Sequence, residues 1–377
     1  MYPTHPLFCI IVFIIAFGTA YLIRLKYKPT VTASRYESID GLRGFLALGV
    51  FIHHATIWYV LLHTGQWVTP ESNLYYHLGE TSVNLFFMIT SFLFVSKLIN
   101  SAEKEFDWVK FFRSRIFRIA PMYYFSLLIT ILLVFIASQF QLLTSWGELF
   151  TSITHWIFFT INGTYKINNF EFTAFVNSAV VWSLAYEWLF YFSLPLIAIF
   201  ILRKKPNIIF LLISASFIVF FYLEHGIVHY YLYAFFGGAI PPVLLKFSFF
   251  QKIKDIYLSI IIVVALAFIG QFYTTQNEWC MLCIVILFNC VALGGTLLGL
   301  LKNNTLKFLG EICYSTYLLH GILLFILFYL LLGMDKSFLL SPFQFCISIF
   351  ILTPVVVIIS FLGYRFIEKP FMDKGKR

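Results

Sequence analysis

The sequence predicts an all-α polytopic membrane protein, and three observations support this class. Hydrophobic residues make up 60% of the 377-residue chain. Charged residues make up only 11% of it, whereas soluble domains carry about a quarter. Apolar runs long enough to cross a bilayer, about 20 residues, recur along the whole chain. This pattern excludes an ordinary cytosolic enzyme, and the large apolar surface excludes a disordered chain.

About eleven transmembrane helices are predicted, a core of ten preceded by one N-terminal helix. Their expected ranges are 6–24, 40–62, 81–99, 120–141, 179–202, 207–223, 229–246, 256–273, 279–301, 310–333 and 342–364. The apolar run around 149–161 is too short to cross and is predicted to be re-entrant or interfacial. The segment 103–119 alternates basic and aromatic residues, which predicts an amphipathic helix at the membrane surface.

The predicted organisation has three regions. An N-terminal transmembrane helix with a cytoplasmic basic loop occupies 1–35, a membrane domain occupies 36–371, and a basic cytoplasmic tail occupies 372–377. The first helix has no basic residue before it and no convincing cleavage site, so we expect a retained anchor and not a signal peptide.

The net charge of +9 is explained by membrane orientation and does not indicate a nucleic-acid partner. Apart from Lys166 and Lys336, the basic residues lie at the start of the second predicted helix or follow odd-numbered ones. Basic loops face the cytoplasm, so the N-terminus is predicted outside and the C-terminus inside.

No metal or redox centre is expected from the cysteines. All six lie in or beside apolar runs. Cys280 and Cys283 form a lone C-x-x-C, without a second pair or nearby histidines. Packing as small apolar residues is the preferred interpretation.

The second predicted helix carries the densest set of ionisable residues, each costly inside a bilayer. At 100° per residue, His54 returns to within about 20° of Arg43, whereas His53 lies about 80° to the other side. Asp40, Arg43 and His54 therefore share a face, with His54 about 16 Å beyond Arg43 along the axis. This face is predicted to line a polar cavity. The alternative is an Asp40–Arg43 cap, with His54 bonded to neighbouring backbone.

The fifth predicted helix supplies a carboxylate at a similar estimated depth. It contains Trp182 and Ser183, and it places Glu187 about eight residues, or 12 Å, from its outer end. A carboxylate beside His54 would orient the imidazole and raise its basicity, as a general base needs. Alternatively, Glu187 is protonated, or is bonded to Ser183 or to tyrosines.

Two further pairs stand out. Arg115 and Arg118 form an R-x-x-R pair at the predicted cytoplasmic surface, which suits a phosphorylated ligand or, equally, lipid head groups. Tyr317 and His320 lie one turn apart on a predicted buried helix. His320 is more typical of a hydrogen-bonded core histidine than of a direct catalyst.

Several segments, in this order over residues 36–371, resemble the acyltransferase-3 family of integral-membrane acyltransferases, which modify cell-surface glycans and other extracytoplasmic acceptors. They are IDGLRGFLALGVFIHH, SVNLFFMITSFL, RSRIFRIAP, VVWSLAYEWLFYFSLPL, LGEICYSTYLLH and YRFIEKPF. The resemblance implies about ten core helices and an acyl donor such as acetyl-CoA. It also implies an essential arginine and histidine on the first core helix, matched by Arg43 and His54. The family R-x-x-R matches Arg115 and Arg118, and its buried glutamate matches Glu187.

Two departures from the family pattern bear on these expectations. The usual Ser-Gly-Phe is Thr90-Ser91-Phe92 here, which argues against close backbone approach at position 91. The helix at 6–24 precedes the family core. In addition, no long C-terminal extension follows the membrane domain, so a stand-alone transferase without the esterase-like domain that some members carry is expected.

The predicted function is membrane O-acyl transfer in a bacterial inner membrane. An acyl group, acetyl in the first instance, would pass from cytoplasmic acyl-CoA to a hydroxyl of a surface or lipid-linked glycan, such as lipopolysaccharide O-antigen or another exopolysaccharide. Arg43, Arg115 and Arg118 would hold donor phosphates. His54, oriented by Glu187, would act as base or as a covalent acyl relay. Expected partners are acyl-CoA, the glycan and membrane lipids. The rival class is a transporter or channel, but its typical related halves are not visible.

Overall fold

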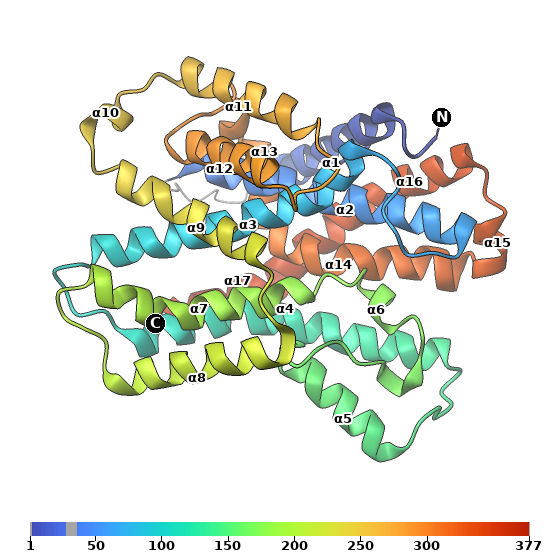
Figure 1. Cartoon of the computed structure of the whole chain (residues 1–377). Coiled ribbons are helices and arrows are strands. Elements are labelled where there is room, and N and C mark those ends of the chain that lie inside the picture. Colours follow the sequence, from blue (N-terminus) through green and yellow to red (C-terminus); the bar gives the residue numbers. More distant parts are fainter. Residues whose placement is uncertain (1, 28–35, 377) are drawn as a thin grey trace. The chain divides into compact units, whose positions relative to one another are not determined.

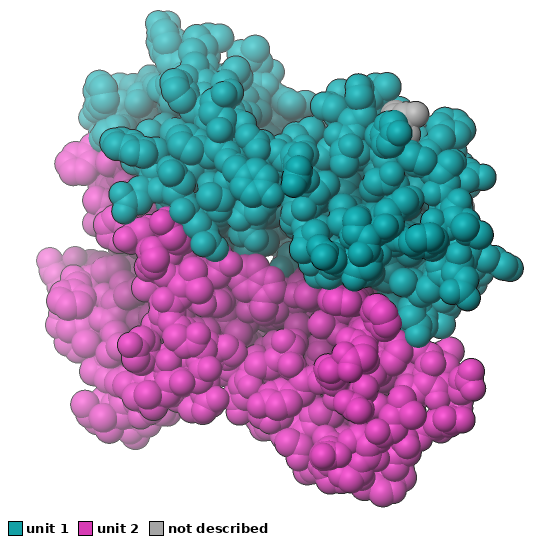
Figure 2. All heavy atoms as spheres, turned by 45° about the vertical axis from the view of Figure 1, so that its right-hand side comes forward, with its two compact units in different colours: residues 1–86, 248–366 teal, residues 87–247, 367–377 magenta. Residues whose placement is uncertain are grey.

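The computed structural model describes residues 2–27 and 36–376. Within these ranges the chain forms helices and no strand, which confirms the all-α class (Figure 1). The chain divides into two compact units (Figure 2). The first comprises residues 1–86 and 248–366, and the second comprises residues 87–247 and 367–377. The predicted basic loop at 28–35 lies outside the described residues.

The first unit contains the N-terminal helix, the second predicted helix and the segment 248–366. Its elements are α1 (Pro6–Tyr27), α2 (Glu37–Thr64), α3 (Asn73–Asn100) as far as residue 86, α10 (Ser248–Gln251), α11 (Asp255–Ile269), α12 (Glu278–Ala292), η2 (Leu300–Lys302), α13 (Asn304–Glu311), α14 (Cys313–Phe325), η3 (Ile326–Leu331), α15 (Met334–Phe338), α16 (Pro342–Gly363) and the start of η4 (Tyr364–Glu368). Helix α2 packs against both α13 and α14, and α14 packs against α16 (Figure 1).

The second unit contains the middle of the chain and its C-terminal end. Its elements are the rest of α3, α4 (Trp108–Ala137), α5 (Trp146–Ile157), η1 (Ile167–Asn169), α6 (Thr173–Val176), α7 (Trp182–Ile201), α8 (Ile208–His225), α9 (His229–Leu244), the end of η4 and α17 (Lys369–Lys376). Helix α7 packs against α8, and α17 packs against α4.

Among the described residues, eight helices are long and apolar enough to cross a membrane, which supports a polytopic membrane protein. They are α1, α2, α3, α4, α7, α8, α14 with its continuation to Leu331, and α16 with its continuation to Gly375. Every one of the eleven predicted spans contains a helix, but α9, α11 and α12 have only 16, 15 and 15 residues. These lengths correspond to about 22–24 Å, less than the roughly 30 Å of a bilayer core.

The prediction of a single helix over 279–301 is wrong, and a glycine explains the break. Helix α12 ends at Ala292, and Gly294 then takes a left-handed conformation with φ 111°. Glycine occupies this region without the steric cost that a side chain brings, so the turn is stable.

The boundary expected near residue 119 is also absent. The sequence predicts a surface helix at 103–119 followed by a span at 120–141, but α4 is continuous from Trp108 to Ala137. The Asp107 side chain caps its start by accepting a hydrogen bond from the backbone N–H of Lys110 at 2.8 Å. Pro121 lies inside the helix without ending it, as membrane helices tolerate.

Helix α5 accounts for the short apolar run predicted as re-entrant or interfacial. It has 12 residues, too few to cross, and its start carries a capping box formed by Ser145 and Glu148. Hydrogen bonds donated by the Thr144 hydroxyl and by Ser145 hold the pKa of the Glu148 carboxyl below its usual range.

Glycines fix the start of α2 in the first unit. A Cβ atom at Gly41 would lie 1.9 Å from the backbone oxygen of Leu301, and one at Gly310 would lie 1.9 Å from the backbone oxygen of Asp40. Backbone therefore contacts backbone here, as at small-residue interfaces between membrane helices. This contact positions the first two turns of α2, which carry Asp40 and Arg43.

Candidate active site

A pair of histidines forms the centre of the candidate site in the first unit. His54 lies on α2 and His320 on α14, and Nδ1 of His54 is 3.1 Å from Nε2 of His320. The other nitrogen of His320, Nδ1, lies 2.9 Å from the backbone oxygen of Thr316. Nδ1 of His54 also lies 3.0 Å from the backbone oxygen of Val50.

These partners assign the protons on the two neutral rings. A carbonyl oxygen only accepts, so Nδ1 of His320 carries a hydrogen and donates it to Thr316. Nε2 of His320 is then an acceptor, and both neighbours of the His54 Nδ1 atom accept hydrogen bonds. Nδ1 of His54 therefore carries the hydrogen. Its Nε2 atom keeps a lone pair, which is the state a general base requires.

The two rings differ in their access. His320 is completely buried, and its ring lies 6.3 Å from those of Phe51 and Tyr317. His54 is half-buried and stacks against Trp67 with ring centroids 6.5 Å apart. The half-buried His54 ring can reach a substrate, whereas the buried His320 ring can only hold His54 in position. Trp67, on the segment after α2, was not identified from the sequence because no local pattern links it to His54.

His53 has a different role from its neighbour. It is buried, and its Nδ1 atom lies 2.7 Å from the backbone oxygen of Tyr75 on α3. A Cβ atom at Gly79 would lie only 2.5 Å from the His53 ring. His53 thus packs α2 against α3, which leaves His54 as the better candidate for chemistry.

The first two turns of α2 carry the predicted charged pair. The Arg43 guanidinium lies 3.9 Å from the Asp40 carboxylate, and both side chains are partly exposed. This is the ion pair that the sequence left open as an alternative. The assignment of Arg43 to the donor remains a prediction.

In the second unit, Glu187 accepts a hydrogen bond from the hydroxyl of Tyr191, one turn later on α7. The Arg115 guanidinium lies 4.7 Å from the centre of the Phe94 ring and interacts electrostatically with Tyr191. A bond from Glu187 to a tyrosine was the sequence's alternative interpretation. His54 belongs to the first unit and Glu187 to the second, so their expected pairing remains a prediction.

Arg118 has a partner that was not identified from the sequence. Its guanidinium forms an ion pair with Glu368 at 3.2 Å, and the Glu368 side chain is fully buried. The sulfur of Met372 lies 2.6 Å from the same guanidinium nitrogen. The terminal YRFIEKPF segment contained the signal, but nothing in it indicated which arginine the glutamate would meet.

The remaining predicted residues support helix packing. The Trp182 ring lies 5.0 Å from that of Tyr231, and the buried Ser183 hydroxyl donates to the backbone oxygen of Val180 at 3.1 Å. Both residues stabilise the start of α7. Tyr317 packs one turn before His320 on α14. Among the described residues, no group of three or more His, Cys, Asp and Glu side chains could hold a metal ion.

The apolar helices define the class of the protein as a polytopic membrane protein. Residues 36–365 match the family described as "Acyltransferase domain", and the chain belongs to this family. It is an integral membrane protein.

Relatives of the chain include proteins of Staphylococcus aureus. The chain is 27% identical over 392 residues to a protein of strain COL named as a putative O-acetyltransferase, covering 93% of this chain and 59% of the relative. It is 25% identical over 388 residues to the O-acetyltransferase OatA of strain NCTC 8325 / PS 47, again covering 93% of this chain and 59% of the relative. The chain thus spans about three fifths of the length of these relatives. No solved structure matches the chain significantly.

Proposed function

We propose that the protein is a membrane O-acetyltransferase that moves an acetyl group from acetyl-CoA to a hydroxyl of a cell-surface glycan. The single observation that carries this proposal is the pair of contacts that Nδ1 of His54 makes with the Val50 oxygen and with His320. From these contacts we infer that the ring hydrogen lies on Nδ1 and that Nε2 keeps the lone pair of a base. The family and the names of the relatives support the reaction class. In this proposal the acceptor hydroxyl belongs to a glycan that is free or lipid-linked.

The proposed reaction is acyl transfer with His54 as general base. Nε2 of His54 takes the proton of the acceptor hydroxyl as the hydroxyl oxygen attacks the thioester carbonyl. A C–O bond forms, the C–S bond breaks, and the imidazolium returns the proton to the leaving thiolate of coenzyme A. Because His320 accepts from Nδ1 throughout, the ring keeps its orientation while its charge changes. In the covalent variant, Nε2 itself attacks the thioester carbonyl, and the C–S bond breaks to release the thiolate of coenzyme A. The glycan hydroxyl then attacks the acyl-imidazole carbonyl, the C–N bond breaks, and the hydroxyl proton passes to the released thiolate.

Arg43, Arg115 and Arg118 are the proposed ligands of the donor phosphates, and the membrane orientation follows. Guanidinium groups bind phosphate in bidentate fashion. With these arginines at the cytoplasmic surface, the N-terminus lies outside and the C-terminus inside the bacterial plasma membrane.

The test of the function uses purified protein in detergent micelles, acetyl-CoA labelled in the acetyl group, and polysaccharide from the source cells. We expect label on the polysaccharide, because transfer needs no closed compartment. A transporter or channel needs two compartments and would leave the polysaccharide unlabelled in micelles. Unlabelled polysaccharide, with protein that still binds acetyl-CoA and acceptor, would contradict the proposal.

The donor site gives a second prediction. Arg115→Ala should raise the KM for acetyl-CoA about 10- to 100-fold, because a hydrogen bond to a charged group contributes roughly 1.5–3 kcal/mol. The folded yield should be unchanged. Initial rates over a range of acetyl-CoA concentrations measure the effect.

Two variants control this measurement. Arg113→Ala removes an exposed arginine from the same helix and should leave the KM unchanged. Arg118→Ala leaves the buried Glu368 carboxylate without its ion pair, so it should lower stability as well. A wild-type KM in Arg115→Ala would mean that this arginine contacts lipid head groups instead.

A further inference from the structure

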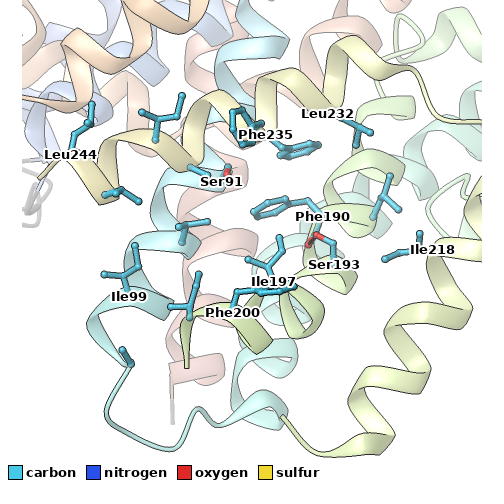
Figure 3. Close-up of a pocket in the computed structure, with 18 of the residues that line it drawn as sticks. Ser91, Ile99, Phe190, Ser193, Ile197, Phe200, Ile218, Leu232, Phe235 and Leu244 are labelled. Atoms are coloured by element: carbon cyan, nitrogen blue, oxygen red, sulfur yellow. Dashed lines mark hydrogen bonds between the residues drawn. The ribbon is translucent and has the colours of Figure 1, made fainter. Parts of the chain in front are cut away.

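A cavity of about 1000 Å³ lies within the second unit, between α3, α7, α8 and α9. This volume is at the upper end of the range for small-molecule sites, about 300–1,000 Å³. Figure 3 places Ser91 near its middle, with Leu244 and Ile99 towards one end and Leu232 and Ile218 towards the other. The lining is apolar except for two serines and a lysine. None of the proposed catalytic or donor-binding residues lines it.

The wall of the cavity is continuous with an exposed apolar surface. Three lining side chains are strongly exposed: Phe200 at 89%, Phe236 at 71% and Val243 at 47%. In an integral membrane protein, large apolar side chains exposed on the membrane helices face lipid hydrocarbon. The molecules that meet this opening at the highest concentration are therefore the lipids of the bilayer.

Two polar groups of the lining are available to an occupant. The Ser91 side chain is completely buried, and its hydroxyl has no hydrogen-bond partner among the described residues. By contrast, the Ser193 hydroxyl donates to the backbone oxygen of Phe190 at 2.7 Å. Lys246 follows α9 by two residues and is exposed, and its ammonium group makes no ion pair with any described residue. A buried hydroxyl without a partner is costly, so an occupant that accepts its hydrogen bond is favoured.

The spacing of these two groups follows from the packing of α3 against α9. A Cβ atom at Gly238 would lie 2.2 Å from the backbone oxygen of Met88, so these residues are level with each other. Ser91 is three residues beyond Met88, and Lys246 is eight residues beyond Gly238. At 1.5 Å per residue, extended two residues past the end of α9, the two residues differ by about 7.5 Å along the helix axes. This separation is comparable with that between the phosphate and the ester groups of a glycerophospholipid.

We propose that this cavity binds an anionic glycerophospholipid of the membrane. One acyl chain occupies the apolar space, the phosphate contacts Lys246, and an ester carbonyl accepts a hydrogen bond from Ser91. A single lysine matches one phosphate, whereas coenzyme A carries several and would require more cations than this lining offers. The site is independent of the proposed acyl transfer.

The test is native mass spectrometry of the purified full chain with added dioleoyl phosphatidylglycerol. We expect one lipid to be retained about 10-fold more tightly than dioleoyl phosphatidylcholine, whose head group carries no net charge. Lys246→Ala should remove this preference. Ala239→Trp, which fills the cavity, should prevent retention of either lipid. Ser91→Gly should weaken the ester-linked lipid to the level of its ether-linked analogue, which lacks the carbonyl.

Matched substitutions outside the cavity separate these effects from damage to the fold. Lys254→Ala removes a lysine eight residues later in the sequence that does not line the cavity, and Ala267→Trp adds the same bulk to an exposed face of α11. Both should bind phosphatidylglycerol as the wild type does. Equal retention of the two lipids would overturn the proposal. So would unchanged binding in Ala239→Trp, or displacement of the lipid by acetyl-CoA or by a polyisoprenyl phosphate.

Discussion

His54→Ala is expected to reduce acyl transfer by about 100- to 10,000-fold, the usual contribution of general acid–base catalysis. The amount of folded protein should stay the same, since the ring is half-buried and its loss leaves no charge unpaired. The physical reason is the loss of Nε2, the nitrogen that remains free to accept a proton when Nδ1 faces Val50 and His320. The measurement is the initial rate of labelled acetyl transfer, with the size-exclusion profile of each variant.

Alanine variants of two other histidines serve as comparisons for His54→Ala. His53→Ala should keep substantial transfer activity while losing stability, because its ring packs α2 against α3. His320→Ala should give an intermediate loss of kcat, since the Val50 oxygen still accepts from Nδ1 of His54. Activity that is lost in His53→Ala and kept in His54→Ala would reverse the assignment.

Gly310→Val should strongly destabilise the folded protein and lower its unfolding temperature. The new Cβ atom would lie 1.9 Å from the backbone oxygen of Asp40, and backbone atoms cannot move aside as a side chain can. Overpacking a core typically costs about 1–3 kcal/mol. We expect the cost here to reach at least the upper end of that range, because α2 and α13 must separate. The temperature of half-maximal loss of the monodisperse peak in detergent measures it.

Gly18→Val is the matched control on α1, where an added Cβ atom would have no heavy atom within 4 Å. This variant carries the same helix-propensity change and should keep the wild-type midpoint within a few degrees. If Gly310→Val and Gly18→Val unfold at the same temperature, the close contact between α13 and the first turn of α2 is not important for stability.

The location of the helices was predictable because their signals are local. An apolar run of about 20 residues is visible in the sequence without any knowledge of its neighbours. The lengths of α9, α11 and α12 were not predictable in the same way. The end of each helix depends on where a turn can form, as at Gly294. Because the residues after α12 are also apolar, the sequence pattern did not indicate this turn.

The candidate site was predictable only along single helices. The eleven-residue spacing of Arg43 and His54 places them on one face by helical geometry alone. Their partners come from elsewhere. His320 is 266 residues from His54 in the sequence, and the Glu368 that pairs with Arg118 lies near the C-terminus. Sequence periodicity carries no information about such contacts.

The sequence by itself determined that this is an all-α membrane protein, which of two adjacent histidines shares a face with Arg43, and which family the motifs resemble. Each of these follows from composition, helical period or ordered local segments. Only the tertiary structure decided which nitrogen of His54 keeps its lone pair, since that depends on the orientation of His320 and on the Val50 oxygen. It also decided that Arg118 meets a buried carboxylate and that Ser91 faces a cavity. These features arise where separate helices pack together, and close packing is a property of the folded chain.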